Sequence, residues 1–182
     1  MEGVTDAQAI DVSLTEPEAF TMLFDRHFDA VHAYAQRRVG PDLADEVAAE
    51  TFTRAFDQRR RYDTSRADAK PWLLGIAANL LRRHWRSERR RLDAYVRSVG
   101  AAERGELSTP LAAELVIALK ALPRREREPL LLLAWADLTY EEIGVALGVP
   151  VGTVRSRISR ARARLRGPNL DGHSPQEVPN NV

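Results

Sequence analysis

The sequence predicts an all-α protein made of two small helical domains joined by a linker, the second of them a helix-turn-helix domain. Apolar residues recur at helical spacing along most of the chain, whereas the strict alternation of a half-buried strand is rare. The helical pattern weakens between Arg91 and Pro110, which divides the helices into two clusters. At 182 residues the chain is long enough for one ordinary domain or two small ones.

The composition restricts the class of protein before any motif is considered. With 44% apolar and 29% charged residues, the chain is typical of soluble globular proteins. No apolar run approaches the length needed to cross a bilayer, and the acidic N-terminus lacks the basic start of a signal peptide, so we expect a cytoplasmic protein without membrane insertion. The absence of cysteine excludes disulfides, thiolate zinc sites and a cysteine nucleophile.

Charge is strongly segregated although the formal net charge is only +1. The first 29 residues carry seven acids and one arginine, whereas Arg82–Arg91 carries six arginines and one glutamate. This asymmetry indicates a basic surface for a polyanion and an acidic surface for a different partner.

The first domain is expected over residues 16–91, after a mobile N-terminal segment of residues 1–15. Its first helix spans Pro17–Val39 and ends at Gly40-Pro41, a pair that breaks helices. A second helix runs from about Leu43 to Phe56, and a polar loop follows it. Pro71 suits the first turn of a third helix, which continues to about Arg91.

The second domain is expected over residues 111–166, after a linker of residues 92–110 that contains two glycines and Ser-Thr-Pro. Residues 167–182 have little to bury and are expected to be a mobile tail. The domain contains four predicted helices: 111–122, 124–135, 140–147 and 152–166.

The last two of these helices have the pattern of a helix-turn-helix. Thr139 and Glu142 form a capping box at the start of the first helix, and Gly148 ends it. The second helix has a narrow apolar stripe, and six arginines without any acid cover the rest. Such a helix is expected to lie in a DNA major groove. The alternative, a solvated arginine-rich helix of another bundle, is disfavoured by the capped first helix and the turn.

The Pro71 helix provides a second basic surface. Trp72, Asn79 and the arginines after it project along one flank, and the polar loop Ser65–Lys70 lies beside that flank. An asparagine among arginines can hydrogen-bond a base while the arginines hold phosphates. For Trp72, packing in or near the core is the favoured interpretation over base stacking. Asn79 alone would be interpreted as a helix-surface amide.

Three segments of the chain, which include these surfaces, resemble a known protein family. The stretches DEVAAETFTRAF, PWLLGIAANLLRRHWR and LTYEEIGVALGVPVGTVRSRISRARARL resemble the extracytoplasmic-function (ECF) sigma factors of the bacterial sigma-70 family, in order and spacing. The resemblance extends over roughly residues 18–166. It implies a subunit that joins core RNA polymerase, reads and melts the −10 promoter element with its first domain, and reads the −35 element with its second.

The resemblance also implies sites, residue by residue. The −35 element would be contacted by Thr153, Arg155, Ser156, Arg157 and Arg160. The −10 element, with capture of a flipped base, would be contacted by Ser65, Arg66, Ala67, Asp68, Lys70, Asn79, Arg83 and Arg86. The clamp helices of the polymerase largest subunit would be contacted by Asp45, Glu46, Glu50, Thr53 and Asp57.

The acidic set is also apparent without the resemblance, because four of its residues fall on one narrow helical stripe that would repel phosphate and suit a basic protein. Family members usually carry a polar Thr-Gln pair where this chain has Ala48-Ala49, so polymerase binding would depend more on the carboxylates. The resemblance further implies an anti-sigma factor as a partner, and neither a cofactor nor a metal is expected.

Two other classes of protein are less consistent with the sequence. An enzyme is not expected, because the chain lacks a His-Glu-x-x-His motif, a phosphate-binding glycine loop and a nucleophile elbow. A stand-alone helix-turn-helix regulator would need a dimer interface to span two half-sites. It would also leave the basic flank of the first domain unexplained.

Overall fold

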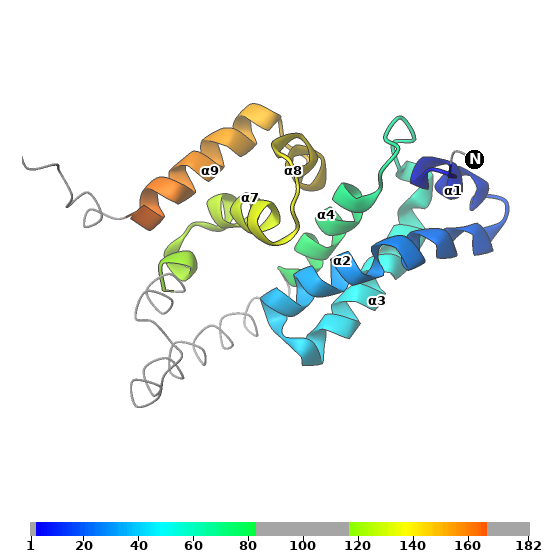
Figure 1. Ribbon diagram of the computed structural model, residues 1–182, viewed down its shortest axis with the longest axis horizontal. Coiled ribbons are helices and arrows are strands. Elements are labelled where there is room, and N and C mark those ends of the chain that lie inside the picture. The colour runs from blue at the N-terminus through cyan, green and yellow to red at the C-terminus, as the bar shows by residue number, and fades with distance from the viewer. Residues whose placement is uncertain (1–2, 83–116, 167–182) are drawn as a thin grey trace, which may run out of the picture.

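The computed structural model describes residues 3–82 and 117–166, and these residues form helices with no strand among them. Two groups of helices are visible in Figure 1, α1 to α4 in blue to green and α7 to α9 in yellow-green to orange. The elements, including two 3₁₀ turns, are α1 (Asp6–Val12), η1 (Pro17–Phe20), α2 (Thr21–Val39), α3 (Pro41–Gln58), η2 (Arg59–Arg61), α4 (Lys70–Leu81), α7 (Arg124–Trp135), α8 (Tyr140–Leu147) and α9 (Val151–Arg166).

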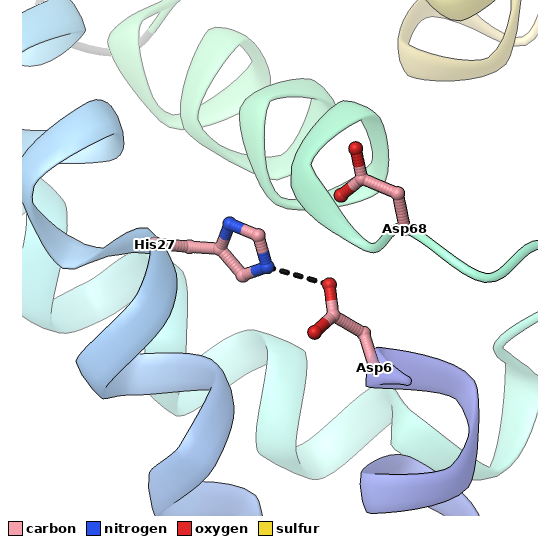
Figure 2. A group of neighbouring side chains, drawn as sticks. All are labelled: Asp6, His27 and Asp68. Carbon is pink, nitrogen blue, oxygen red and sulfur yellow. Dashed lines mark hydrogen bonds and ion pairs between the residues drawn. The ribbon is translucent and has the colours of Figure 1, made fainter. Parts of the chain in front are cut away.

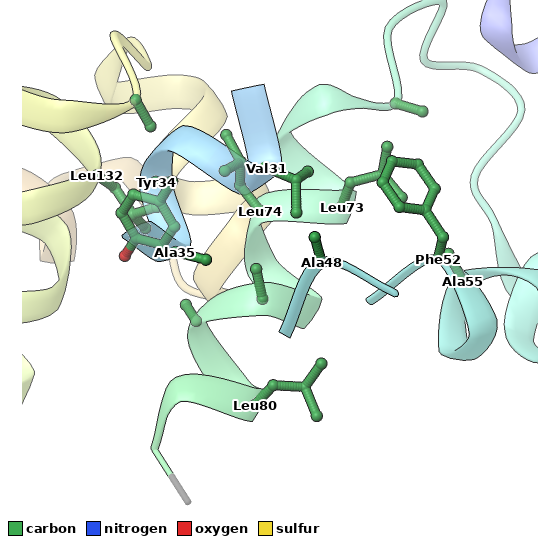
Figure 3. Close-up of a cluster of buried hydrophobic side chains, with 14 of the residues drawn as sticks. Val31, Tyr34, Ala35, Ala48, Phe52, Ala55, Leu73, Leu74, Leu80 and Leu132 are labelled. Atoms are coloured by element: carbon green, nitrogen blue, oxygen red, sulfur yellow. The ribbon is translucent and has the colours of Figure 1, made fainter. Parts of the chain in front are cut away.

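The first group is a bundle in which α2, α3 and α4 pack pairwise against one another. Its apolar stripes meet in the centre, where Val31, Ala48 and Leu73 are fully buried (Figure 3). Gly40 connects α2 to α3 at a φ of 92°, a conformation that glycine adopts without steric cost. The predicted helix boundaries in this half are correct to within a few residues, with the first predicted helix divided into η1 and α2.

The prediction of a mobile segment over residues 1–15 is wrong for α1. The side chain of Thr5 accepts a hydrogen bond from Gln8 N–H while the side chain of Gln8 accepts one from Thr5 N–H, which is a capping box. Ala9 and Ile10 are each only 1% exposed. The helix is short, but its cap and the burial of this apolar pair fix it against the bundle.

The second group is built on α7, against which both α8 and α9 pack. The predicted capping box is confirmed, with Glu142 N–H donating to Thr139 Oγ1 and Thr139 N–H donating to Glu142 Oε2. Gly148 ends α8 at a φ of 63°, in the left-handed conformation typical of helix C-termini. Val154, Ile158 and Ala161 form the buried stripe of α9, as predicted, whereas Leu165 is only partly buried.

The two groups of helices pack against each other, which the sequence analysis did not predict. Helix α4 contacts α8, and the buried side chains of both groups form one continuous hydrophobic cluster. Gly75 of α4 lies so close to α8 that a Cβ atom there would be 2.3 Å from the carbonyl oxygen of Ala146. Helix α4 is therefore buried over more of its surface than one apolar stripe would explain, with Leu74, Ala78 and Leu81 also inside.

Polar contacts reinforce the same interface from α2. Arg38 is almost fully buried, and its guanidinium forms a two-pronged ion pair with the Glu128 carboxylate of α7, with N···O distances of 2.9 and 3.1 Å. The neighbouring Arg37 donates to the backbone carbonyl of Trp135 at 2.8 Å.

Several sequence predictions lie outside the described residues. These are the linker over 92–110, the tail over 167–182, residues 111–116 of the predicted helix over 111–122, and the extension of the third helix beyond residue 82. Within residues 3–82 and 117–166, no helix is both long and apolar enough to cross a membrane.

A test of the contact between α4 and α8 compares two glycine substitutions. Gly75→Ala is expected to force the two helices apart, because the added methyl group would overlap the backbone of Ala146. Gly152→Ala should be neutral or slightly stabilising, since a Cβ there meets nothing within 4 Å and alanine favours a helix by about 1 kcal/mol over glycine. Small-angle scattering should show an expanded particle for Gly75→Ala alone. Equal compactness of the two variants would contradict the close approach.

Candidate nucleic-acid interface

Helix α9 presents a basic surface that points away from its buried stripe. Arg155, Ser156 and Arg160 are exposed, and Thr153 and Arg157 are partly exposed. The hydroxyl of Ser156 donates to the Thr153 carbonyl at 3.0 Å and lies 3.4 Å from an Nη atom of Arg160. All five residues predicted for the upstream element therefore lie on one helix with access to solvent, in the arrangement that a recognition helix requires.

The ion pairs of α9 indicate which of its arginines attach the helix to α7 and which are accessible to DNA. The Glu126 carboxylate of α7 is fully buried and lies 2.9 Å from Arg164 Nε and 3.6 Å from Arg160 Nε. Arg164, at the shorter distance, helps to attach α9 to α7, whereas Arg160, whose side chain is about half exposed, remains accessible to a phosphate. Arg155 lies 3.5 Å from Glu141, but both side chains are about two-thirds exposed, and exposed pairs are weak. Arg155 can therefore exchange this partner for a base edge at little cost.

The loop before α4 is a structured turn whose side chains face solvent. Asp63 Oδ1 accepts hydrogen bonds from the backbone N–H and the hydroxyl of Ser65, and the Tyr62 hydroxyl donates to the Arg66 carbonyl at 2.7 Å. Burial, with nearby carboxylates, raises the pKa of Tyr62 to about 12, so this phenol keeps its proton, and with it the hydrogen bond to the Arg66 carbonyl, into the alkaline range. The predicted −10 contacts in this loop are accessible to solvent. Lys70 is partly exposed, and the fully exposed residues are Ser65, Arg66, Ala67 and Asp68.

Two further residues of α4 bear on this surface, one beside the loop and one near the opposite end of the helix. Trp72 is partly buried, and its ring packs on that of Tyr62 at 5.0 Å between centroids, as the packing interpretation predicted. Asn79 is exposed near the other end of the helix. The predicted contacts Arg83 and Arg86 lie outside the described residues.

The packing of the two groups of helices brings the two candidate surfaces together. Asn79 of α4 and Arg157 of α9 line the same pocket, which has a volume of about 390 Å³ and includes Arg124 and Arg125 of α7. From the sequence, the surface on α9 and the surface on α4 were expected to be separate sites. In this conformation they share one cavity.

The acidic set occupies α3, on a different part of the first group. Glu46, Thr53 and Asp57 are exposed, as is Asp45, which lies 3.1 Å from His32 Nε2. Glu50 is half-buried and pairs with Arg54 at 2.6 Å, so the stripe is partly neutralised.

An aromatic hollow borders this acidic stripe, and the sequence analysis did not identify it. It has a volume of about 370 Å³ and is lined by Phe20, Phe24, Phe52, Phe56 and Thr53, among others. Phe24 is 42% exposed, which is high for so large an apolar side chain. Because Thr53 belongs to both features, the hollow and the acidic stripe form one continuous face.

Both groups of helices match known protein families. Residues 23–91 match the family described as Sigma-70 region 2, and residues 113–165 match Sigma-70, region 4. The ECF RNA polymerase sigma factor SigE of Mycolicibacterium smegmatis is 36% identical over 79% of this chain and 59% of its own length. The RNA polymerase sigma factor CarQ of Myxococcus xanthus is 32% identical over 82% of this chain and 88% of its own length.

Among solved structures, CnrH in complex with the cytosolic domain of CnrY resembles this chain with a TM-score of 0.63 at 26% identity. The match covers 93% of this chain and 99% of CnrH.

The availability of Arg155 leads to a prediction about sequence discrimination. Arg155→Ala should reduce discrimination between upstream duplex sequences by about 1–3 kcal/mol, the usual worth of a good base contact. The matched control is Arg162→Ala, an exposed arginine two turns further along the same helix, where a phosphate contact would weaken binding to all sequences alike. Competition binding with the polymerase-bound chain would measure both. Unchanged discrimination in Arg155→Ala would remove this residue from the site.

Proposed function

Because the chain belongs to the ECF sigma factors of the sigma-70 family, we propose that it binds core RNA polymerase, directs it to specific promoters and opens the DNA there. The observation that carries the proposal is the presence, in one chain, of a basic helix-turn-helix and a separate exposed loop that leads into α4, the helix that carries the exposed Asn79. A stand-alone regulator would account only for the first of these two features.

In this proposal α9 reads the −35 element in the major groove. Its N-terminal residues Thr153, Arg155 and Ser156 contact base edges, and Arg157 and Arg160 lie further along the helix toward the phosphates. The packing of α9 against α7 through its buried stripe sets the angle of the helix, and the ion pair of Arg164 with buried Glu126 adds to this support. Direct readout depends on such a rigid support, because hydrogen bonds to base edges require exact placement.

The −10 element is read by the first group of helices, through the loop Ser65–Lys70 and Asn79. The loop carries polar side chains and backbone groups held by its own hydrogen bonds, so it can receive a base without first becoming ordered. Extrusion of a base from the duplex costs a few kcal/mol, which contacts in such a pocket must offset. Asn79 offers both an amide donor and an acceptor for the edge of the base.

This function requires the two groups of helices to separate. The −35 and −10 elements lie roughly 25 base pairs apart, which is about 85 Å at 3.4 Å per base pair. Asn79 and Arg157 line one pocket in the closed conformation, so both cannot contact their elements at once. We infer that the described conformation is closed, and that the contact between α4 and α8 is broken when the chain binds polymerase and promoter.

The face formed by the acidic stripe and the aromatic hollow is proposed to bind the clamp helices of the polymerase largest subunit. Protein interfaces commonly have an apolar centre and a polar rim, and this face has both. The hollow of phenylalanines would supply the apolar contact, and Glu46, Glu50 and Asp57 would attract a basic partner. Asp45 would lie at the margin of the contact.

A protein that stabilises the closed conformation would prevent promoter recognition, and we propose that an anti-sigma factor restrains this chain in such a way. The structural relative CnrH was solved in complex with the cytosolic domain of CnrY, which shows that a related fold binds a protein partner. Any partner that spans α4 and α8 together would favour the closed conformation.

Transcription reconstituted from purified core polymerase and this chain tests the proposed function. Start sites mapped after overexpression would provide the promoters, and permanganate footprinting would report strand opening.

Asn79→Ala is expected to retain duplex binding by the polymerase complex but to reduce opening, because it removes only the partner of the flipped base. Absence of any core-dependent initiation by the unaltered chain would refute the function, and normal opening by Asn79→Ala would remove that residue from it.

The docking face is tested by charge reversal. Glu46→Lys with Glu50→Lys should weaken core binding strongly and in a salt-dependent way, since two attractions become repulsions and a lysine at position 50 would face Arg54. Asp11→Lys with Asp29→Lys makes the same change in net charge at two exposed acids that lie neither on α3 nor around the aromatic hollow, and it is expected to leave core binding nearly unaltered. Equal affinities of the two double variants at low salt would show that this face does not bind core.

A further inference from the structure

We propose that Asp6, in the N-terminal helix, is a positioning residue for the promoter-opening loop. The proposal rests on the function assigned above to the loop Ser65–Lys70. Helix α1 precedes the residues matched by the Sigma-70 region 2 family, which begin at residue 23. The role of Asp6 is therefore inferred from its contacts in this chain.

Asp6 is buried, and its hydrogen bonds join three segments of the chain. One carboxylate oxygen accepts from an Nη atom of Arg26 in α2 at 2.8 Å. The other lies 2.6 Å from Nε2 of His27, also in α2 (Figure 2). The second oxygen also accepts from Ala69 N–H at 2.9 Å, and Asp6 N–H donates to the Ala67 carbonyl at 3.1 Å. One residue thus connects α1 and α2 to two backbone groups of the loop.

These contacts compensate for a weak start of α4. The N-cap position of α4 is occupied by alanine, which has no side chain to accept from the unpaired N–H groups of the first turn. Asp6 accepts from Ala69 N–H, and Asp68 accepts from Lys70 N–H at 2.8 Å. The negative charge of Asp6 also lies near the positive end of the helix dipole, which adds to the stabilisation.

The loop is consequently held at both ends while its side chains remain exposed. Tyr62 fixes the carbonyl of Arg66, and Asp6 fixes Ala67 and Ala69. A loop held in this way does not lose conformational freedom when a base enters, so more of the contact energy is available for recognition. Loss of the Asp6 carboxylate would release Ala69 at the start of α4, and the backbone contact with Ala67 alone would remain.

The cluster is better described as a hydrogen-bonded anchor than as a cation site. Asp6, His27 and Asp68 present ligand atoms within 4.8 Å of one another. Both oxygens of Asp6 are already engaged, however, and the guanidinium of Arg26 lies in direct contact with one of them. A divalent cation would have to displace that arginine and the Ala69 N–H.

Base preference on single-stranded DNA tests the role of Asp6 without requiring a melting step. The probes are two single strands of non-template −10 sequence from a mapped promoter, identical except at the flipped base, bound to core polymerase carrying the full chain. The unaltered chain is expected to prefer the natural base, and Asp6→Ala should lower that preference at least tenfold. Asp6→Asn should restore part of it, because an amide oxygen can still accept from Ala69 N–H.

Ser13→Ala is the matched control for general destabilisation of α1. The Ser13 hydroxyl is buried and donates to the Ile10 carbonyl at 2.6 Å, at the opposite end of the helix from the loop. This variant should lose stability and keep the base preference. If Asp6→Ala retains the same base preference as Ser13→Ala, the positioning role is wrong. If the unaltered chain itself shows no preference, the function assigned to the loop fails instead.

Discussion

The ion pair between Arg38 and Glu128 is the interaction on which the closed arrangement of this protein depends. Both side chains are almost fully buried, one from each group of helices, and they meet through two parallel hydrogen bonds. A second donor contact, from Arg38 to the Tyr34 hydroxyl at 2.7 Å, orients the guanidinium. Removal of one member of a buried pair typically costs about 3–5 kcal/mol, because the other charge is left without compensation.

The pair therefore stabilises the interface as long as it is fully closed, and it ceases to oppose separation once the two groups of helices have come apart. When the groups of helices remain together, Arg38 makes the two short contacts with the Glu128 carboxylate, and Arg124 lies farther from it, at 3.9 Å. When the groups separate, Arg38 and Glu128 both become hydrated and the penalty of burial disappears. The apolar contact between α4 and α8 disappears in the same step, since Gly75 and Ala146 approach too closely for an intermediate spacing to retain good packing. Such a contact suits a protein with two conformations, in one of which Asn79 and Arg157 share a pocket.

The sequence predicted the parts of this protein whose causes are local. The capping box at Thr139, the turn at Gly148 and the buried stripe of α9 depend on residues within a few positions of one another, and all are present. Helix α1 was missed although Thr5 and Gln8 form an equivalent cap, because an acidic start with few apolar residues is also typical of a mobile terminus.

The contacts between distant residues could not be predicted in the same way. Arg38 and Glu128 are 90 positions apart, and each in isolation is an ordinary charged residue of a helix. The same holds for Asp6 and Ala69, which are 63 positions apart. One sequence signal was available for the interface: Gly75 and Ala78 place two small residues three positions apart on α4, beside its main apolar stripe, and small residues permit a close approach by another helix.

Energy transfer between two dyes tests the central claim, that a closed chain opens on the promoter. Because the chain has no cysteine, exposed positions such as Arg61 and Ala163 can be changed to cysteine and labelled, one on each group of helices. The account predicts high transfer in the unbound chain and low transfer in an actively initiating complex with core polymerase and promoter DNA. It also predicts low transfer in the unbound Glu128→Ala variant. Transfer that remains unchanged between the unbound chain and the initiating complex would contradict the account.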